Sequence, residues 1–304
     1  MSSRGFYTFP VAPGLGTPAA ATAGEEPGIR QVSSYDLYFA PWSYSPDKEF
    51  AAQDLYPYVG GEFVWTGFDY LGEPTPFDAS RSSYFGIIDL AGFKKDRFYL
   101  YQSYWRPDHP MAHILPHWTW LERSGQLTPV HVYTSGDEAE LFLNGKTLGR
   151  KRKSQFEYRL RWDDVVYEPG VLRVVAYKNG KQWATDSVKT AGPAGRLLLE
   201  PDRSAISADG NDLCFVTLTV ADRSGEAVPR ADNEIHFRIS GPGEIAATDN
   251  GDPTDITPFP SRERKAFKGL AMVIVRSKRR QKGPIVITAT SNGLGEAKTT
   301  INAR

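Results

Sequence analysis

The sequence lacks the features that would place it in several large classes of protein. It has a single cysteine, Cys214, so it cannot close an internal disulfide. That residue lies in the alternating stretch LCFVTLTV, which predicts a buried thiol rather than a reactive one. The 36 basic and 36 acidic residues cancel, so no net field would draw the chain to nucleic acid or to an anionic membrane surface.

Long apolar runs and familiar catalytic signatures are also missing. No run of about 18 apolar residues is present, so the sequence predicts no transmembrane helix. The first residues, MSSRGFYTFPVAPG, lack a basic stretch followed by a long apolar core, so we expect no signal peptide in this chain. Walker, GxGxxG, CxxC and GxSxG motifs do not occur. Nucleotide binding, dithiol chemistry and the serine-hydrolase elbow therefore have no support.

Glycine and proline are plentiful, with 28 and 22 residues, which favours turns and short strands over long helices. The length of 304 residues indicates two or three domains, at roughly 100–200 residues each. An aromatic-rich zone runs to about residue 103, and two zones of period-two alternation follow, over about 111–190 and 196–304. AGPAG, residues 191–195, is the expected linker between the last two.

The first zone predicts one βα unit. Val11–Gly28 is rich in small residues, glycine and proline, and predicts a surface loop or insertion. A short helix is expected with Ser45 as N-cap and Pro46 at its first position, ending before Pro57. GEFVWTGF then predicts a strand buried on both faces, and FGIIDLAGFKKDRFYLYQSYW a turn and a helix. One such unit, or two, is far short of the eight that an α/β barrel needs.

The second and third zones each predict a small β-sandwich. In the second, PVHVYTSG, AELFLNGKTLGRK, FEYRLRWDDV and GVLRVVAYKNGKQWATDSV alternate with period two. Asn144-Gly145 and Asn179-Gly180 are signals for type I′ hairpin turns. In the third, LCFVTLTVADRSGEAVP, NEIHFRISGPGEIAATDNG, KGLAMVIVRS and GPIVITATSNG predict strands separated by turns.

Three acidic residues in GEFVWTGFDYLGEPTPF, Gly61–Phe77, are candidates for acid/base chemistry, which needs paired carboxylates. If Phe63–Phe68 is a strand, Glu62 and Asp69 lie near its opposite ends, roughly 20 Å apart at about 3.3 Å per residue. That is too far to share one reacting atom. We therefore expect these acids, and Glu73, to make hydrogen bonds at the strand ends and in the loop.

Trp65, in the middle of that predicted strand, has two interpretations: packing in a core, or a platform for the C–H face of a sugar ring. The same question applies to four tryptophans of the second zone, for which burial is favoured over an exposed carbohydrate-binding surface: Trp118, Trp120, Trp162 and Trp183.

The histidines give little support to a metal site. His109, His113 and His117 have the spacing of one helix face, but two prolines among them break any helix there. We expect these side chains, and His131, to serve packing between domains, and we expect no metal and no cofactor. The basic runs KRKSQ and SKRRQKG are expected to be solvated hairpin turns rather than nucleic-acid patches.

Longer segments resemble a known family. GEFVWTGFDYLGEPTPF, followed by SRSSYFGIIDLAGFKKDRFYLYQSYW, closely resembles the end of the catalytic barrel in bacterial β-galactosidases of glycoside hydrolase family 2. HILPHWTW with VHVYTSGDEAELFLNGKTLGRK is similar to the small β-sandwich that follows this barrel. NGDPTDITPF with SRERKAFKGLAMVIVRS is similar to the immunoglobulin-like domain at the C-terminus of longer members. The resemblance covers nearly the whole chain, in order.

The resemblance implies a retaining mechanism with two glutamates, an acid/base and a nucleophile, about 5–5.5 Å apart. In the family the nucleophile lies in a Glu-Thr-Ala-Ser-like segment that runs into Ser-Ser-Arg-Gly, which this chain has at Ser2–Gly5. Both glutamates are therefore expected upstream of Met1, leaving no catalytic residue in this chain and no activity by itself. The resemblance also implies one set of substrate-binding residues: Trp65, Arg4, Asp69, Glu73 and Arg81.

The fold implied by the resemblance is mostly β. It comprises the C-terminal βα segment of a (β/α)8 barrel over residues 1–104, a small β-sandwich over 105–192 and a C-terminal immunoglobulin-like β-sandwich over 193–304. The implied substrate is a β-galactoside or a galactose-containing oligosaccharide. The alternatives are a parent enzyme acting on β-glucuronides or β-mannosides, and a non-catalytic carbohydrate-binding or structural module.

The resemblance also bears on partners and location. A second copy of the chain or a complementing barrel chain is a candidate partner, and neither nucleic acid nor a membrane is expected. A periplasmic or extracellular location is favoured for the parent enzyme. A barrel segment without the rest of its barrel would expose a strand edge and an apolar helix face, so we expect the first zone to pack poorly by itself.

Overall fold

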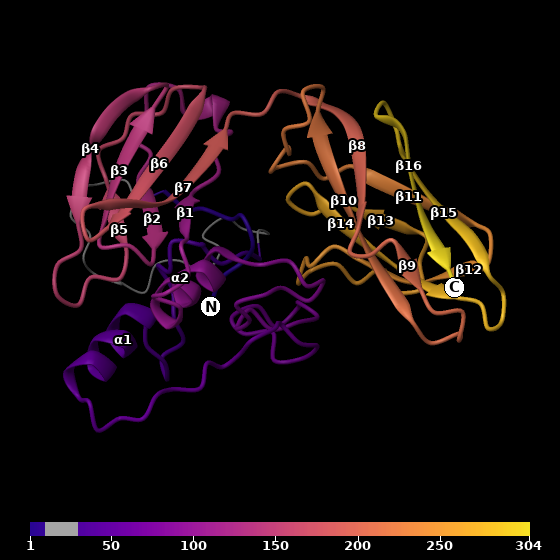
Figure 1. Cartoon of the computed structure of the whole chain (residues 1–304), viewed down its shortest axis with the longest axis horizontal. Helices are drawn as coiled ribbons and strands as arrows, with labels where there is room; N and C mark the ends of the chain where they lie inside the picture. Colours follow the sequence, from indigo (N-terminus) through magenta and orange to yellow (C-terminus); the bar gives the residue numbers. More distant parts are fainter. Residues whose placement is uncertain (10–29) are drawn as a thin grey trace. The chain divides into compact units, whose positions relative to one another are not determined.

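The computed structural model describes residues 1–9 and 30–304, which form two units, Met1–Thr190 and Ala191–Arg304. The insertion predicted at 11–28 lies outside these residues. Both units consist mainly of antiparallel β-sheets, coloured up to pink in the first unit and from there to yellow in the second (Figure 1). The expectation of a mostly β fold is confirmed, and the chain passes from one unit to the other at the AGPAG stretch.

The first unit carries the two helices expected from the sequence. Helix α1 spans Pro46–Leu55, although the Ser45 side chain makes no capping hydrogen bond. Helix α2 spans Asp96–Trp105, and a 3-10 turn, η1, spans Leu121–Arg123. The strands of this unit are β1 (Ala112–Leu115), β2 (Val130–Thr134), β3 (Glu138–Leu143), β4 (Lys146–Arg152), β5 (Leu160–Trp162), β6 (Val171–Lys178) and β7 (Lys181–Lys189).

These strands form two sheets, in the orders β1-β2-β5 and β4-β3-β6-β7. Val132 and Leu160 of the first sheet share one buried core with Leu141 and Val174 of the second, as alternating strands of a sandwich do. The hairpin turns are as predicted, because Asn144 and Gly145 have φ of 51° and 81°, the positive values that a type I′ turn requires. Asn179-Gly180 closes the β6–β7 hairpin in the same way.

Both helices pack onto this core. Phe50 of α1 and Leu100 of α2 are fully buried and belong to the same apolar cluster as the sheets. The Arg159 guanidinium, just before β5, donates from Nε to Asp47 Oδ1 of α1 at 2.9 Å. The expectation that the first zone packs poorly is therefore wrong for Phe50 and Leu100, which the sandwich core covers. It does hold for the exposed apolar residues between Leu55 and Leu71, described below.

The tryptophans of the sandwich are mostly structural. Trp118, Trp162 and Trp120 are buried, which confirms the interpretation favoured from the sequence. Trp118 donates its indole N–H to the Glu168 carbonyl at 2.9 Å. Trp183, on β7, is half-buried and donates to Ser135 Oγ at 2.8 Å.

The second unit is a separate pair of sheets with its own core. Its strands are β8 (Ala194–Pro201), β9 (Ala205–Ile206), β10 (Leu213–Asp222), β11 (Glu234–Ser240), β12 (Gly243–Asp249), β13 (Glu263–Lys265), β14 (Leu270–Ser277), β15 (Gly283–Ser291) and β16 (Gly295–Ala303). The sheet orders are β12-β14-β10-β8 and β13-β11-β15-β16-β9. Cys214, on β10, is fully buried with a free thiol, as predicted, and burial raises its pKa to about 11.

No helix among the described residues is long and apolar enough to cross a membrane.

Candidate functional site

Gly61–Phe77 contains no regular strand, although the apolar run GEFVWTGF at its start predicts one. It is irregular coil, attached to the following segment by single bridges, Phe68 with Ile88 and Leu71 with Ser82. A strand needs a hydrogen-bonded neighbour along its whole length, and here only the last residues have one. The Thr66 N–H donates to the Phe85 carbonyl at 3.4 Å, and the Ile87 and Ile88 N–H groups donate to the Thr66 and Gly67 carbonyls at 3.1 and 3.0 Å. The expectation that this stretch is buried on both faces is also wrong, because Phe63, Trp65 and Phe68 are exposed.

Trp65 stands at the surface, with 71% of its area exposed, and a polar relay fixes its indole ring. Its Nε1–H donates to the Tyr70 hydroxyl at 3.1 Å, and that hydroxyl donates in turn to the Glu73 carboxylate. The rings of Trp65 and Tyr70 meet edge to face with centroids 6.2 Å apart. Burial and the Glu73 carboxylate raise the pKa of Tyr70, so this hydroxyl stays a donor at neutral pH. Trp65 thus presents an apolar ring to solvent in a defined orientation.

Asp69 lies beneath this surface. Its Oδ2 is 2.7 Å from the Lys95 ammonium, and its Oδ1 accepts the Gly86 N–H at 2.8 Å. Lys95, at the start of α2, also donates to the Ser2 carbonyl at 2.9 Å. Both side chains are buried, and desolvation, opposed by Lys95, raises the pKa of Asp69 to about 6. This ion pair fastens the coil to the base of α2.

Arg4 and Arg81 lie in different surroundings. Arg4 is buried and forms an ion pair with Asp89, and its guanidinium stands 4.5 Å from the centre of the Phe93 ring. Arg81 is half-buried, and its carbonyl accepts the Gly72 N–H at 2.9 Å, beside the Leu71–Ser82 bridge. Of the five predicted residues, the structure joins Trp65 to Glu73 through Tyr70 and buries Asp69 and Arg4 in separate ion pairs.

Two residues that the sequence analysis did not single out complete this arrangement. Tyr70 links Trp65 to Glu73, and Lys95 neutralises Asp69. Tyr70 lies within Gly61–Phe77, so its hydroxyl could have been recognised in the sequence as a hydrogen-bond partner for Trp65 or Glu73. The partnership of Lys95 with Asp69 depends on how α2 returns to the coil, which no local pattern shows.

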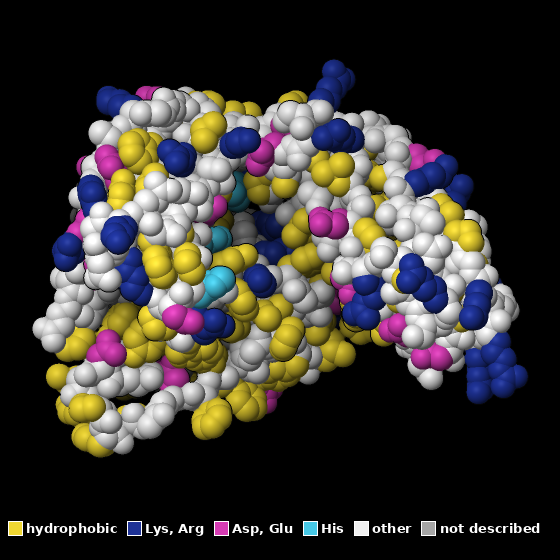
Figure 2. Space-filling view, in the orientation of Figure 1, with side chains coloured by type: hydrophobic (Ala, Val, Ile, Leu, Met, Phe, Trp, Pro, Cys, Tyr) yellow, Lys and Arg dark blue, Asp and Glu magenta, His cyan; other side chains and the backbone are white. Residues whose placement is uncertain are grey.

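Large apolar side chains gather on the surface of the first unit, over the part where Figure 1 places α1 and the coil after it (Figure 2). They come from one stretch of the chain, and Phe63 and Tyr58 are the most exposed, at 104% and 83%. An apolar surface of this kind normally has a partner. Its members are Trp42, Tyr44, Leu55, Tyr56, Tyr58, Val59, Phe63, Trp65, Phe68 and Leu71.

The histidines are held apart by separate contacts. His113 Nε2 lies 2.7 Å from Asp96 Oδ1 and its ring stacks on Tyr99, while His117 stacks on Trp120. Among residues 1–9 and 30–304, no three His, Cys, Asp or Glu side chains are grouped as metal ligands would be.

Glu62 has the carboxyl with the most unusual proton affinity near this segment. Burial, and then the neighbouring Glu49 carboxyl on α1, raise its pKa from 4.5 to about 7, while Gln53 opposes the shift. Its folded pKa exceeds its unfolded pKa of 4.5, so the protonated form favours the folded state. The associated stability is fully present below about pH 4 and is lost as the pH rises through about 7.

We therefore expect the Glu62 carboxyl to titrate near pH 7 by ¹³C NMR. Glu49→Gln should lower the midpoint, although not to the ordinary value, because burial is the larger cause. Glu122→Gln, on the exposed turn η1, is the matched control and should leave it unchanged. A midpoint near the ordinary value in the unmodified chain would contradict this assignment.

Comparison with known proteins places this geometry in a family. Residues 197–300 match the glycoside hydrolase family 2 C-terminal domain 5, and residues 125–184 match a domain of unknown function (DUF4982). The chain is 43% identical over 272 residues to the β-galactosidase BoGH2A of Bacteroides ovatus, covering 89% of this chain and 32% of that protein. It is 36% identical over 247 residues to a putative β-glucuronidase of Formosa agariphila, covering 78% and 23%. The chain thus spans about a third or less of these relatives.

Solved structures give the same result. A β-glycosidase from Bacteroides vulgatus aligns with a TM-score of 0.84 and 36% identity, over 90% of this chain and 34% of that one. A glycosyl hydrolase family 2 member from Bacteroides cellulosilyticus aligns with a TM-score of 0.78 and 29% identity, over 85% and 38%. The proteins matched are hydrolases of glycosidic bonds. The chain belongs to glycoside hydrolase family 2 and matches a C-terminal portion of its enzymes.

Proposed function

We propose that the chain is part of a retaining β-galactosidase. Residues 1–104 supply the last part of its (β/α)8 barrel, 105–192 a small sandwich and 193–304 an immunoglobulin-like sandwich. The whole enzyme hydrolyses terminal β-D-galactosides with two glutamates about 5–5.5 Å apart, and a preceding segment of the enzyme carries both. The residues described here then bind sugar and hold the barrel wall, and they cleave nothing by themselves.

The exposed indole of Trp65 is the observation that carries this proposal. Its N–H is already directed to Tyr70, so its ring face is free to receive the C–H face of a pyranose. Glu73, at the end of the same relay, is placed to accept a sugar hydroxyl. Asp69 and Arg4 act from beneath by fixing the coil through Lys95 and Asp89. Arg81 borders the same coil.

The apolar surface around Trp65 supports the barrel assignment. Besides Trp65, nine large apolar side chains between Trp42 and Leu71 are exposed. In a closed barrel, flanking strands and helices bury such residues. The similarity to the Bacteroides ovatus β-galactosidase, which extends over 89% of this chain, is consistent with that setting.

The test is a chimera in which this chain replaces the matching part of the Bacteroides ovatus β-galactosidase. We expect the chimera to hydrolyse an aryl β-D-galactoside, and Trp65→Ala to lower kcat/KM about tenfold, which corresponds to about 1.4 kcal/mol of lost sugar contact. Phe63→Ala is the matched control, because it removes another aromatic ring from the same coil, one that carries no N–H for the Tyr70 relay to orient.

The chain by itself should show no turnover above buffer, because the proposal assigns both catalytic glutamates to a preceding segment of the enzyme. Asp69 is tied to Lys95 and Glu73 to Tyr70. Turnover by the isolated chain that Glu62→Gln, Asp69→Asn or Glu73→Gln abolishes would overturn the proposal. Equal losses in the Trp65 and Phe63 variants would reject the sugar platform alone.

A second substrate class is favoured by one finding: several matched relatives are named β-glucuronidases. The same chimera assayed on an aryl β-D-glucuronide separates the two. A preference of tenfold or more for the glucuronide would replace the galactoside assignment while leaving the barrel assignment intact.

A further inference from the structure

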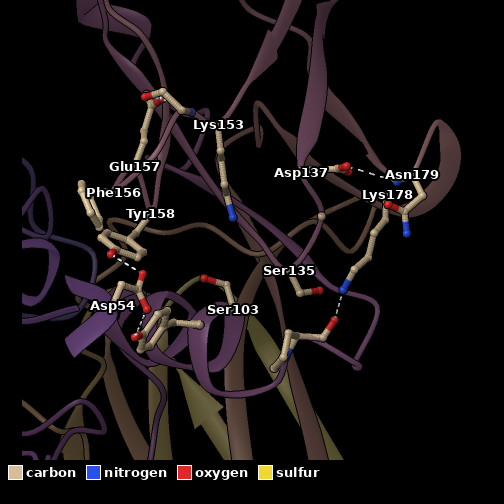
Figure 3. A pocket seen from close by; sticks show the side chains of 14 residues that line it. Asp54, Ser103, Ser135, Asp137, Lys153, Phe156, Glu157, Tyr158, Lys178 and Asn179 are labelled. Carbon is tan, nitrogen blue, oxygen red and sulfur yellow. Dashed lines mark hydrogen bonds between the residues drawn. The ribbon is translucent and has the colours of Figure 1, made fainter. Parts of the chain in front are cut away.

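A pocket of about 420 Å³ opens in the first unit. It lies between the ends of α1 and α2 and the loops that follow β2, β4 and β6, and Figure 3 shows Lys153 pointing into it. Its volume falls in the range of about 300–1,000 Å³ that ligand pockets occupy. Neither Trp65 nor any other residue proposed for the catalytic site contributes to its lining.

The acidic side of the pocket is held in place by hydrogen bonds. Asp54, near the end of α1, accepts from the hydroxyls of Tyr104 and Tyr158 at 2.8 and 2.6 Å. Glu157 accepts from both the N–H and the hydroxyl of Ser154, each at 2.9 Å. Groups of the wall itself therefore already donate hydrogen bonds to both carboxylates. These two side chains shape the pocket and need no bound cation.

The basic side has donor capacity to spare. Lys153 donates to the Thr134 carbonyl and Lys178 to the Pro107 carbonyl. An ammonium group has three N–H donors, so each lysine keeps donors for a ligand. Burial, and then the nearby Lys178, lower the pKa of Lys153 to about 8. Lys153 therefore remains largely charged at neutral pH although Lys178 repels it. A ligand that accepts a hydrogen bond from Lys153 would offset that repulsion.

The wall also holds a hydrogen-bond acceptor, the Asp137 carboxylate. Its Oδ2 accepts the Asn179 N–H at 3.2 Å, and its Oδ1 is shielded from solvent. A carboxylate oxygen can accept two hydrogen bonds, so Oδ2 keeps a lone pair for a ligand hydroxyl.

An aromatic side chain completes the rim. Phe156 is 39% exposed and has a φ of 62°, a left-handed conformation that is rare for a bulky residue. The loop holds Phe156 at the pocket mouth despite that cost, which points to a role for the ring.

We propose that this pocket is a non-catalytic binding site for a neutral saccharide unit. A hydroxyl group accepts from Lys153 or Lys178 and donates to Asp137, which a simple anion or cation cannot do. The apolar face of the sugar ring packs on Phe156. The site is independent of the proposed galactosidase function, because it shares no residue with the Trp65 surface.

The test uses the whole chain and ¹H–¹⁵N NMR titrations with lactose and cellobiose, and with sodium glucuronate and sodium sulfate. The Trp183 indole N–H, which donates to Ser135 Oγ in the pocket wall, is a local reporter. We expect saturable shifts of this signal with a neutral disaccharide in the millimolar range. Phe156→Ala and Asp137→Asn should each weaken that binding at least tenfold. Gln155→Ala, an exposed neighbour outside the lining, and Trp65→Ala should not.

Three outcomes overturn the proposal. The first is saturation by sulfate or glucuronate but by no neutral disaccharide, which would make the pocket an anion site. The second is binding that Trp65→Ala removes and the pocket variants leave intact. The third is the absence of any saturable shift. Lys153→Gln keeps a hydrogen-bond donor but removes the charge, and it is the control in case another variant fails to fold. It should retain the fold and lose part of the affinity.

Discussion

Replacing Arg264 with methionine is expected to destabilise the second unit by about 3–5 kcal/mol. Arg264, on β13, is 1% exposed and stands at the centre of the loop that carries NGDPTDITPF. Its guanidinium bonds Asp255 at 2.9 Å and the carbonyls of Thr248, Thr257 and Pro258 at 2.7, 3.0 and 2.9 Å. Methionine fills much of the volume but leaves three carbonyls without this donor. It also leaves the Asp255 carboxylate without its charge partner, held by the Asn250 side chain and the Thr257 N–H.

Cys214 provides a specific readout for this prediction. It is the only cysteine of the chain and is fully buried on β10 of the second unit. Its raised pKa keeps the thiol unreactive until the unit opens, so its labelling rate by a disulfide reagent reports the free energy of opening. All seven tryptophans belong to the first unit, and their fluorescence shows whether that unit is unaffected.

The matched control is Arg276→Met. Arg276 pairs with Glu244 at 2.6 Å in an exposed bridge, which contributes at most about 1 kcal/mol. Arg264→Lys should recover only part of the loss, because an ammonium cannot reach four acceptors in the plane of a guanidinium. Equal labelling rates in the Arg264 and Arg276 variants would show that the buried arginine contributes no more to the stability of the second unit than an exposed ion pair does.

The strands that were predicted correctly are those that local chemistry determines. Asn144-Gly145 and Asn179-Gly180 require positive φ, and each turn sets the register of its two strands. Period-two burial along β3 and β15 follows the alternation of the sequence. The short strand β1 was missed because its four residues stand between prolines, where too few positions remain to show a period.

GEFVWTGF was predicted wrongly as a strand for a different reason. Its apolar run predicts burial, but a strand also requires backbone hydrogen-bond partners along its length, which the local sequence does not specify. Even burial fails at Trp65, whose side chain is apolar and yet exposed. Lys153 shows the converse: KRKSQ was expected to be a solvated turn, yet Lys153 enters a pocket because the loop after β4 folds back towards the helices. The ion pairs Asp69–Lys95 and Arg4–Asp89 likewise depend on tertiary approach.

The second large effect is expected at Lys95. Lys95→Met should destabilise the first unit by about 3–5 kcal/mol at pH 8, because it leaves the Asp69 carboxylate buried with one backbone donor, the Gly86 N–H. The pKa of Asp69 is already raised to about 6, and losing Lys95 raises it further. An acid whose folded pKa exceeds its unfolded pKa loses stability as the pH rises through that interval. The cost of the substitution should therefore be smaller at pH 5, where Asp69 is mostly protonated.

Urea unfolding followed by tryptophan fluorescence at both pH values measures this cost, since every tryptophan lies in the first unit. Lys94→Met is the matched control: Lys94 is exposed over the Phe98 ring at 4.5 Å, so we expect a change within about 1 kcal/mol. In the double variant Lys95→Met, Asp69→Leu the losses should not add, because removing both charges also removes the unpaired one. A cost for Lys95→Met that is independent of pH, or strictly additive with Asp69→Leu, would mean that the ion pair does not hold this coil.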